Sequence, residues 1–131
     1  MFKYKSTVKM RDSDAAGIMF FGKYYFIAHD AYEAFMESVN CSLKTFIDES
    51  DYMPLIVHSE ADYKKPLKYG EQFEIEIEVS NIGDSSFTLV YNIRNSTGET
   101  VANVKTVHVA VNLASRKKCP LPEDFKSKLR S

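Results

Sequence analysis

The sequence predicts an α+β domain in which a curved antiparallel sheet of about five strands wraps around one long helix. Residues 2–10 and four later segments alternate apolar and polar side chains, which is the period of a half-buried strand. Residues 24–39 instead repeat apolar side chains at every third or fourth position, which is the period of a helix. Because no helix separates the four later strands, we expect them to pair mainly antiparallel and to offer one face to the single long helix.

Length and composition indicate one domain, spanning residues 1–131. The chain is long enough to bury a hydrophobic core, and 17 Lys and Arg against 18 Asp and Glu give a net charge of -1. This balance argues against a nucleic-acid partner. The N-terminus lacks the apolar run of a signal peptide and no membrane-spanning run follows, so we expect a cytoplasmic protein without a membrane partner. Cys41 and Cys119 are expected as free thiols, and neither a metal nor a cofactor is predicted.

The first half of the chain is expected to hold one strand and the helices. Apolar residues alternate with lysines over residues 2–10 and predict the first strand. The long helix is expected from Tyr24 to Val39, with Asn40 ending it, and its apolar stripe is wide enough to contact both a sheet and a neighbouring subunit. Residues 42–49 predict a short second helix or a turn.

The second half of the chain is expected to hold four strands, at residues 53–65, 73–79, 87–93 and 101–113. Pro66 ends the first of them, and the last three should form an antiparallel meander. The apolar pattern of the final strand shifts between Val101 and Val107, which predicts a bulge near residues 104–106. The chain then leaves the sheet through a basic, proline-containing segment, and its last residues predict either a short polar helix or a frayed tail.

The connection between the first strand and the long helix carries Asp12, Asp14 and Gly17, followed by aromatic residues. Backbone N–H groups at a helix start lack intrahelical acceptors, so they can stabilise a carbonyl oxygen on which negative charge develops. A carboxylate beside them can attack that carbonyl or activate water, and these two parts together suit acyl transfer. Aspartates are also common in turns, where they bond nearby amides, so this stretch alone leaves both interpretations open.

The segment DSDAAGIMFFGKY resembles the hot-dog-fold thioesterases, in the branch that includes 4-hydroxybenzoyl-CoA thioesterase. That family carries a DxDxxG segment, an apolar stretch and a tyrosine near the helix start, matched here by Asp12, Asp14, Gly17 and Tyr24. Three further segments, HDAYEAF, PLIVHSEADYKKP and SRKKCPLP, are similar to the 1,4-dihydroxy-2-naphthoyl-CoA thioesterases of menaquinone and phylloquinone synthesis. The resemblance covers nearly the whole chain and implies a hot-dog fold and hydrolysis of an aromatic acyl-CoA.

The resemblance also implies roles for individual residues. Asp14 takes the catalytic position, either attacking the thioester carbonyl to form an anhydride or acting as a general base on water. The backbone N–H of Phe21 is the expected donor to the carbonyl oxygen, with the N–H of Gly22 beside it as a weaker candidate, while Asp12 is expected to support the turn. Residues expected at the acyl group are Gly17, Met19, Phe20 and Tyr24, with His58 as a further candidate.

Arg116, Lys117 and Lys118 form the densest basic run, which could bind the phosphates of coenzyme A or simply be solvated. Lys64 and Lys65 are weaker candidates for the same role. Three residues have roles that the sequence leaves open: His29, Glu33 and His108. We expect His58 and His108 to face solvent or a subunit interface, with contact to the acyl group as the alternative for His58.

A homo-oligomer is expected, at least a dimer and in full a tetramer, because a sheet with one helical layer leaves its edges and second face uncovered. Two alternatives to an aromatic acyl-CoA thioesterase stay open: a less selective enzyme for short or medium acyl chains, and a non-catalytic module that binds acyl-CoA or acyl-carrier protein. A hydratase of related fold ranks last, because Gly22 stands where other members of the branch often carry a histidine.

Overall fold

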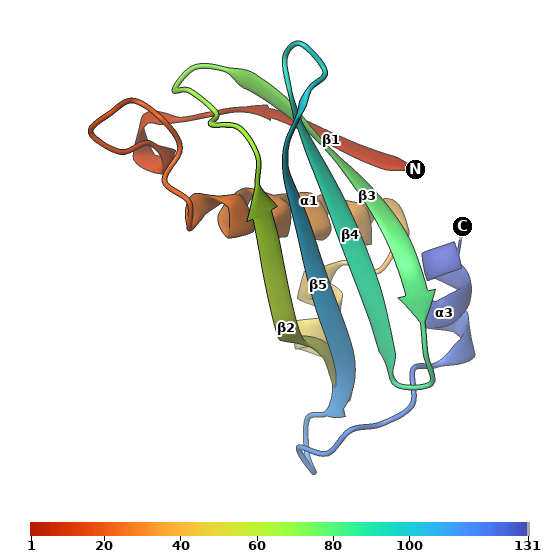
Figure 1. Ribbon diagram of the computed structural model, residues 1–131. Helices are drawn as coiled ribbons and strands as arrows, with labels where there is room; N and C mark the ends of the chain where they lie inside the picture. Colours follow the sequence, from red (N-terminus) through yellow and green to blue (C-terminus); the bar gives the residue numbers. More distant parts are fainter. Residues whose placement is uncertain (131) are drawn as a thin grey trace.

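The computed structural model describes residues 1–130 and contains one five-stranded antiparallel sheet in the order β1-β3-β4-β5-β2 (Figure 1). Its strands are β1 (Phe2–Thr7), β2 (Tyr52–Tyr63), β3 (Gln72–Ile82), β4 (Ser86–Asn95) and β5 (Thr100–Asn112). Strands β3, β4 and β5 form the expected antiparallel meander, and β1 and β2 add to its two sides. The predicted α+β class and strand count are therefore confirmed.

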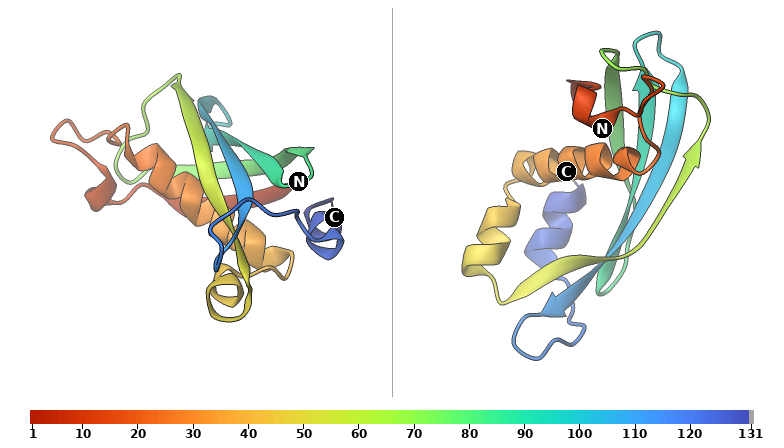
Figure 2. Two further views of the ribbon diagram at one scale, coloured as in Figure 1. Left: turned by 90° about the horizontal axis from the view of Figure 1, so that it is seen from below. Right: turned by 90° about the vertical axis from the view of Figure 1, so that its left-hand side faces the viewer.

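Helix α1 (Lys23–Ser38) crosses the concave face of the curved sheet (Figure 2). Its buried side chains recur every three or four positions and form the stripe that the sequence predicted: Tyr24, Ile27, Ala28, Ala31, Tyr32, Phe35 and Met36. Opposite them, alternate residues of β3 and β4 such as Ile75 and Leu89 are fully buried. Each such side chain contributes about 1.5–3 kcal/mol of stability, so the helix–sheet contact accounts for most of the core.

Two shorter helices close one end of this core. The segment left open between a short helix and a turn forms helix α2 (Leu43–Glu49), and the chain end, left open between helix and tail, forms helix α3 (Glu123–Arg130). Phe125 and Leu129, one turn apart on α3, are buried, and the Phe125 ring lies edge-on to the rings of Phe46 and Phe87 at 5.6 Å between centroids. No helix within residues 1–130 is long and apolar enough to cross a membrane.

The prediction of a bulge near residues 104–106 is wrong. Pairing of β5 with both neighbours is regular there, and the register instead shifts at Val101, between the pairs Ile93–Ala102 and Arg94–Thr100. The inward face beyond this shift carries Thr106 and His108, which are polar but buried, while the valines alternating with them stand on the other face. The sequence pattern misled because apolarity and burial do not coincide in this strand.

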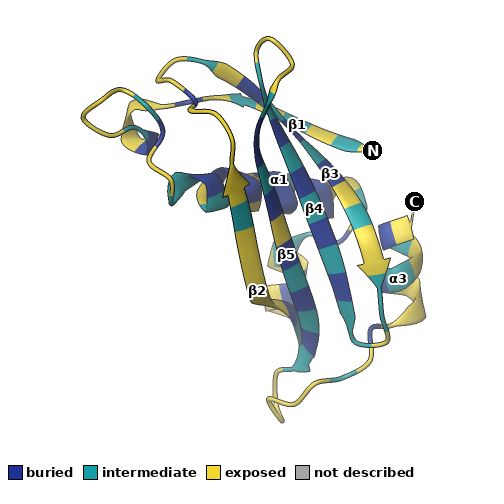
Figure 3. Ribbon diagram, viewed as in Figure 1, coloured by how far each residue is buried: buried dark blue, intermediate teal, exposed yellow. Residues whose placement is uncertain are grey.

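Strand β2 is one of the two edges of the sheet, with β1 at the other, and most of its residues are exposed (Figure 3). Among the described residues it pairs with β5 alone, so one side of its backbone has no partner strand. Its register shifts at Val57, and cross-strand pairs share a face of the sheet, so Ile56 lies on the α1 side with its partner His108 whereas His58 lies on the convex side with Val107. This bulge corrects the simple alternation expected for residues 53–65.

Candidate active site

The acidic connection folds into a small hairpin that projects from the body of the protein at the start of α1 (Figure 2). The Asp14 N–H donates to the Ile18 carbonyl at 2.8 Å, and the Phe20 N–H donates to the Asp12 carbonyl at 2.9 Å. Strand β1 ends at Thr7, earlier than expected, and a turn of 3-10 helix at Met10–Asp12 leads into this hairpin. The first strand and the site are therefore joined by ordered backbone.

Asp14 lies at the exposed side of this hairpin and holds its turn in shape. One carboxylate oxygen, Oδ1, accepts the N–H groups of Ala16 at 2.8 Å and Ile18 at 3.4 Å. The other oxygen, Oδ2, has no hydrogen-bond partner within residues 1–130, so it is free to attack a carbonyl or to take a proton. Gly17 has φ = 79°, a conformation that disfavours any side chain, and this explains the glycine.

Asp12 has the supporting position. Its side chain is buried, with 7% of the residue exposed, and its Oδ2 accepts the Lys9 N–H at 3.3 Å. Arg11 approaches the other oxygen at 3.8 Å. The structure thus separates the two aspartates: one is buried in the frame of the turn, and the other presents an oxygen to solvent.

The start of α1 presents two free backbone donors. Among the described residues, neither the Phe21 N–H nor the Gly22 N–H has an acceptor, whereas the next two N–H groups already bond back into the first turn. Gly22 has ordinary helical angles, but a Cβ there would lie 3.0 Å from the Phe20 ring. Glycine at this position therefore leaves room for an exposed aromatic ring beside the two donors.

A pocket of about 290 Å³ opens beside these donors. It is lined by Ile18, Met19, Phe21, Tyr24, Tyr63, Lys64, Lys65 and Pro66. The rings of Phe21 and Tyr24 both lie edge-on to Tyr63, at 6.2 and 5.2 Å between centroids. The expected residues Met19 and Tyr24 thus belong to this pocket, and the strand end carrying Lys64 and Lys65 lies at its border.

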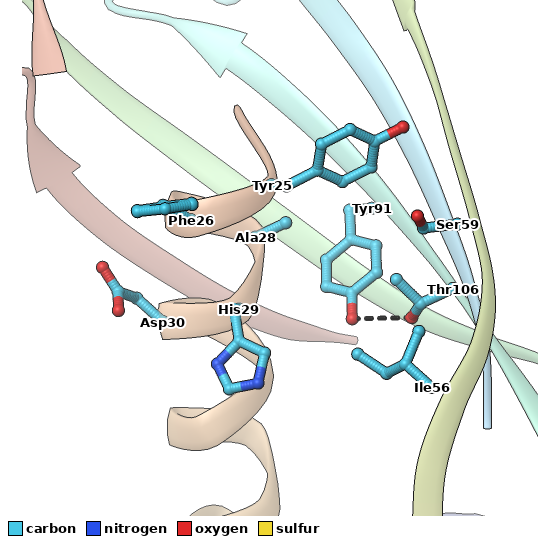
Figure 4. Close-up of a pocket in the computed structure, with 9 residues that line it drawn as sticks. All are labelled: Tyr25, Phe26, Ala28, His29, Asp30, Ile56, Ser59, Tyr91 and Thr106. Carbon is cyan, nitrogen blue, oxygen red and sulfur yellow. Dashed lines mark hydrogen bonds between the residues drawn. The ribbon is translucent and has the colours of Figure 1, made fainter. Parts of the chain in front are cut away.

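A larger cavity of about 440 Å³ lies further along α1, between this helix and β2 (Figure 4). It is lined by Tyr25, Phe26, Ala28, His29, Asp30, Ile56, Ser59, Tyr91 and Thr106. None of these residues was predicted from the sequence to bind the substrate, and His29 had no role assigned. The width of the helix's apolar stripe was the available signal, because Tyr25 and Phe26 add aromatic surface that the sheet does not cover.

A chain of hydrogen bonds runs across the inner face of the sheet behind this cavity. The Tyr91 hydroxyl lies 2.9 Å from Thr106 Oγ1, which in turn lies 2.8 Å from His108 Nε2. His108 was expected at solvent or an interface, but it is fully buried between the rings of Phe87 and Tyr32. Burial, with a smaller contribution from nearby His29, lowers the pKa of His108 from 6.5 to about 3, so the ring is neutral at physiological pH.

Other expected site residues lie apart from the turn within one chain. His58 points to the convex face, where its Nε2 lies 3.0 Å from Glu60. The basic run at residues 116–118 follows the end of β5, next to the first residue of β2, whereas the pocket lies at the last residue, Tyr63. The eleven residue steps along β2 span about 36 Å, so this run cannot reach the pocket of its own chain.

Comparison with known proteins gives a consistent result. A family model described as the thioesterase-like superfamily matches residues 8–129. The chain is 34% identical to a 1,4-dihydroxy-2-naphthoyl-CoA hydrolase from Rippkaea orientalis, over 100% of this chain and 96% of that protein. A crystal structure of a 1,4-dihydroxy-2-naphthoyl-CoA thioesterase from Synechocystis superposes with a TM-score of 0.93 at 27% identity, covering 99% of this chain and 96% of the other. The structure of a gentisyl-coenzyme A thioesterase superposes with a TM-score of 0.88 at 26% identity, covering 98% of this chain and 99% of the other.

Proposed function

Since this chain belongs to the thioesterase-like superfamily, we propose that it hydrolyses 1,4-dihydroxy-2-naphthoyl-CoA to the free acid and coenzyme A, a step of menaquinone and phylloquinone synthesis. The observation that carries this proposal is the presence of two reactive parts in the connection between β1 and α1: the free carboxylate oxygen of Asp14, and the unpaired N–H groups of Phe21 and Gly22. The free thiols of Cys41 and Cys119 are consistent with a cytoplasmic enzyme.

The reaction follows from these parts. The thioester carbonyl oxygen accepts hydrogen bonds from the Phe21 and Gly22 N–H groups, which stabilise the negative charge that develops there. Asp14 either bonds to the carbonyl carbon, so that the thiolate leaves and water later opens the anhydride, or takes a proton from a water that attacks the same carbon. Both routes consume one water and yield the acid and the thiol. In either route, losing one such N–H donor would cost about a hundredfold or more in rate.

We also propose that the site is completed by a second copy of the chain. Large apolar side chains along the start of α1 and the edge of β2 are exposed, including Phe21 at 62%, Phe26 at 62% and Val57 at 60%. The unpaired edge of β2 can bond to the same edge of a partner, antiparallel about a twofold axis, which joins the two sheets. That contact would cover both cavities and remove Asp14 from bulk water, which one chain cannot do.

The same arrangement supports a role for the basic run in the neighbouring site. Antiparallel pairing of the two β2 edges would place the first residue of one β2 beside Tyr63 of the other. Residues 116–118 follow Asn112, which pairs with Tyr52 at that first residue, so the run of one subunit would approach the pocket of its partner. We propose that Arg116, Lys117 and Lys118 bind the coenzyme A phosphates in trans, together with Lys64 beside the pocket.

A thiol-release assay tests the proposed function. The wild-type protein should release coenzyme A from 1,4-dihydroxy-2-naphthoyl-CoA faster than from benzoyl-CoA or a fatty acyl-CoA. Asp14→Asn should keep the melting temperature within about 2 °C and lower kcat by a hundredfold or more, because the exposed side chain contributes little to packing. Equal rates on all three substrates would favour a less selective thioesterase, and no release from any would favour a binding module. An unchanged kcat in Asp14→Asn would remove Asp14 from the mechanism.

A further inference from the structure

The cavity between α1 and β2 is an apolar space with a polar floor. Aromatic and aliphatic side chains form most of its sides, with His29 and Asp30 on the helix side, and the hydroxyl-bearing residues Tyr91, Thr106 and Ser59 meet on the sheet side (Figure 4). A pocket of about 440 Å³ with a few convergent polar groups has the size and character of a site for a small aromatic group. The Tyr91–Thr106 hydrogen bond, 2.9 Å long, lies at this floor.

Counting hydrogens in this floor shows where a donor is left over. Tyr91, Thr106 and a neutral His108 carry one mobile hydrogen each, but only two hydrogen bonds link them. If Tyr91 donates to Thr106 and Thr106 donates to His108 Nε2, the third hydrogen lies on His108 Nδ1, which is buried without a partner among residues 1–130. If His108 Nε2 donates to Thr106 and Thr106 donates to Tyr91, the third hydrogen lies on the hydroxyl of Tyr91, a residue that lines the cavity, and this hydrogen can bond to a ligand. Nδ1 lacks a partner in both directions, but a buried N–H without an acceptor is rarer in folded proteins than a buried acceptor without a donor, so the second direction is favoured.

The cavity also lies in the right direction from the reacting atoms. Its first residue on α1, Tyr25, follows Phe21 by four residues, which is about 6 Å of helix rise. A thioester whose carbonyl oxygen sits on the Phe21 and Gly22 N–H groups can therefore extend its ring along α1 toward Tyr91. The position-1 hydroxyl of a 1,4-dihydroxy-2-naphthoyl group lies next to the thioester, so the hydroxyl at position 4 is the one that enters deeper.

We propose that the Tyr91 hydroxyl, oriented by Thr106 and His108, recognises the hydroxyl at position 4 of the acyl ring and makes the enzyme selective for substrates that carry it. This inference rests on the proposed function, whose site it extends. A pocket with a directed buried donor rejects an analogue that cannot satisfy it, because the donor is left unpaired in a dry environment. Apolar contacts alone discriminate far less well.

Two substrates that differ in one hydroxyl test the inference: 1,4-dihydroxy-2-naphthoyl-CoA and 1-hydroxy-2-naphthoyl-CoA. Each kcat/KM is divided by the substrate's rate of hydroxide hydrolysis, which removes any difference in intrinsic reactivity. The wild-type enzyme should prefer the dihydroxy substrate by tenfold or more. Tyr91→Phe should lower kcat/KM for that substrate by about 10- to 100-fold and change the monohydroxy value by less than about threefold, so that the preference disappears.

Two variants serve as comparisons. Tyr4→Phe removes a phenol on β1, at the opposite edge of the sheet from β2, and should leave both constants unchanged. Thr106→Val keeps the side-chain shape but releases Tyr91, and it should reduce the preference in the same direction as Tyr91→Phe. Melting temperatures show whether each variant is folded, and the wild-type preference does not depend on any variant.

The outcomes separate this inference from the proposed function. A wild-type enzyme that releases coenzyme A from neither substrate would overturn both. A wild-type enzyme that hydrolyses both substrates equally well would leave the function standing and overturn the role of Tyr91. The same holds if folded Tyr91→Phe loses activity equally on both substrates, because that pattern belongs to a structural role.

Discussion

The His108 ring on β5 stacks on the Phe87 ring on β4, with centroids 4.5 Å apart and planes 6° from parallel. These residues are direct cross-strand partners, so the imidazole belongs to the hydrophobic core and not to a surface. Its position gives a prediction about stability. It also places a neutral imidazole at the end of the hydrogen-bonded chain that holds Tyr91.

Stability should fall in mild acid because of His108. Burial lowers its pKa from 6.5 to about 3 in the folded state, so between these values the unfolded chain binds a proton that the folded chain does not. The stabilising contribution is full above pH 6.5 and is lost as the pH falls toward 3. Lowering the pH from 7 to 5 should therefore reduce the free energy of unfolding by about 2 kcal/mol through this group. Urea titrations of the wild type and of His108→Phe at both pH values measure it, and equal pH dependence in the two proteins would contradict the assignment.

The turn that carries Asp14 should depend on the backbone conformation of Gly17. With φ = 79° and open space around the Cβ position, a substitution is penalised by backbone strain and not by a clash. Gly17→Ala should cost about 1–2 kcal/mol and lower kcat, because the hairpin shifts under Asp14. Gly17→Asn should retain more of both, since asparagine tolerates this conformation. Thermal unfolding and kcat are the measurements, and an alanine variant equal to the asparagine variant would argue against the explanation.

The unpaired edge of β2 should be the dimer contact. Val57→Lys adds a charge to that edge and should convert the dimer to a monomer with at least tenfold lower kcat/KM, because the site would lose its cover. Thr7→Lys places the same charge on exposed β1 at the opposite side of the sheet and should change neither property. Light scattering after size exclusion gives the mass. A Val57→Lys protein that stays dimeric and active would place the interface elsewhere.

The basic run should act on the partner's site. One protein carries Asp14→Asn, and the other has residues 116–118 changed to alanine, which should raise KM for the acyl-CoA. In a mixed dimer, trans action gives one intact site, with Asp14 from the second protein and the basic run from the first. Mixing equal amounts should then restore about a quarter of the wild-type activity at low substrate concentration, because random exchange makes about half of the dimers mixed and each mixed dimer has one intact site of two. No gain beyond the sum of the separate proteins would mean that the run acts within its own chain or not at all.

Local patterns were sufficient for much of this architecture. The helical stripe of α1, the meander of β3, β4 and β5 and the turn holding Asp14 and Gly17 all depend on neighbours within a few residues, and each was predicted. The last helix was only half predicted, because its apolar residues Phe125 and Leu129 are too few to indicate a helix until they meet the core.

What the sequence determined by itself was the order of elements, the family and the position of the acidic turn before α1, since these are properties of short segments and their residue types. What only the tertiary structure decided was which face each side chain takes after a bulge and which distant residues meet. The shift at Val57 turns His58 away from α1, and the pairing of β4 with β5 brings Tyr91 to Thr106. A one-residue shift reverses every following side chain, and long-range pairing leaves no local pattern, so neither could be found before the chain was folded.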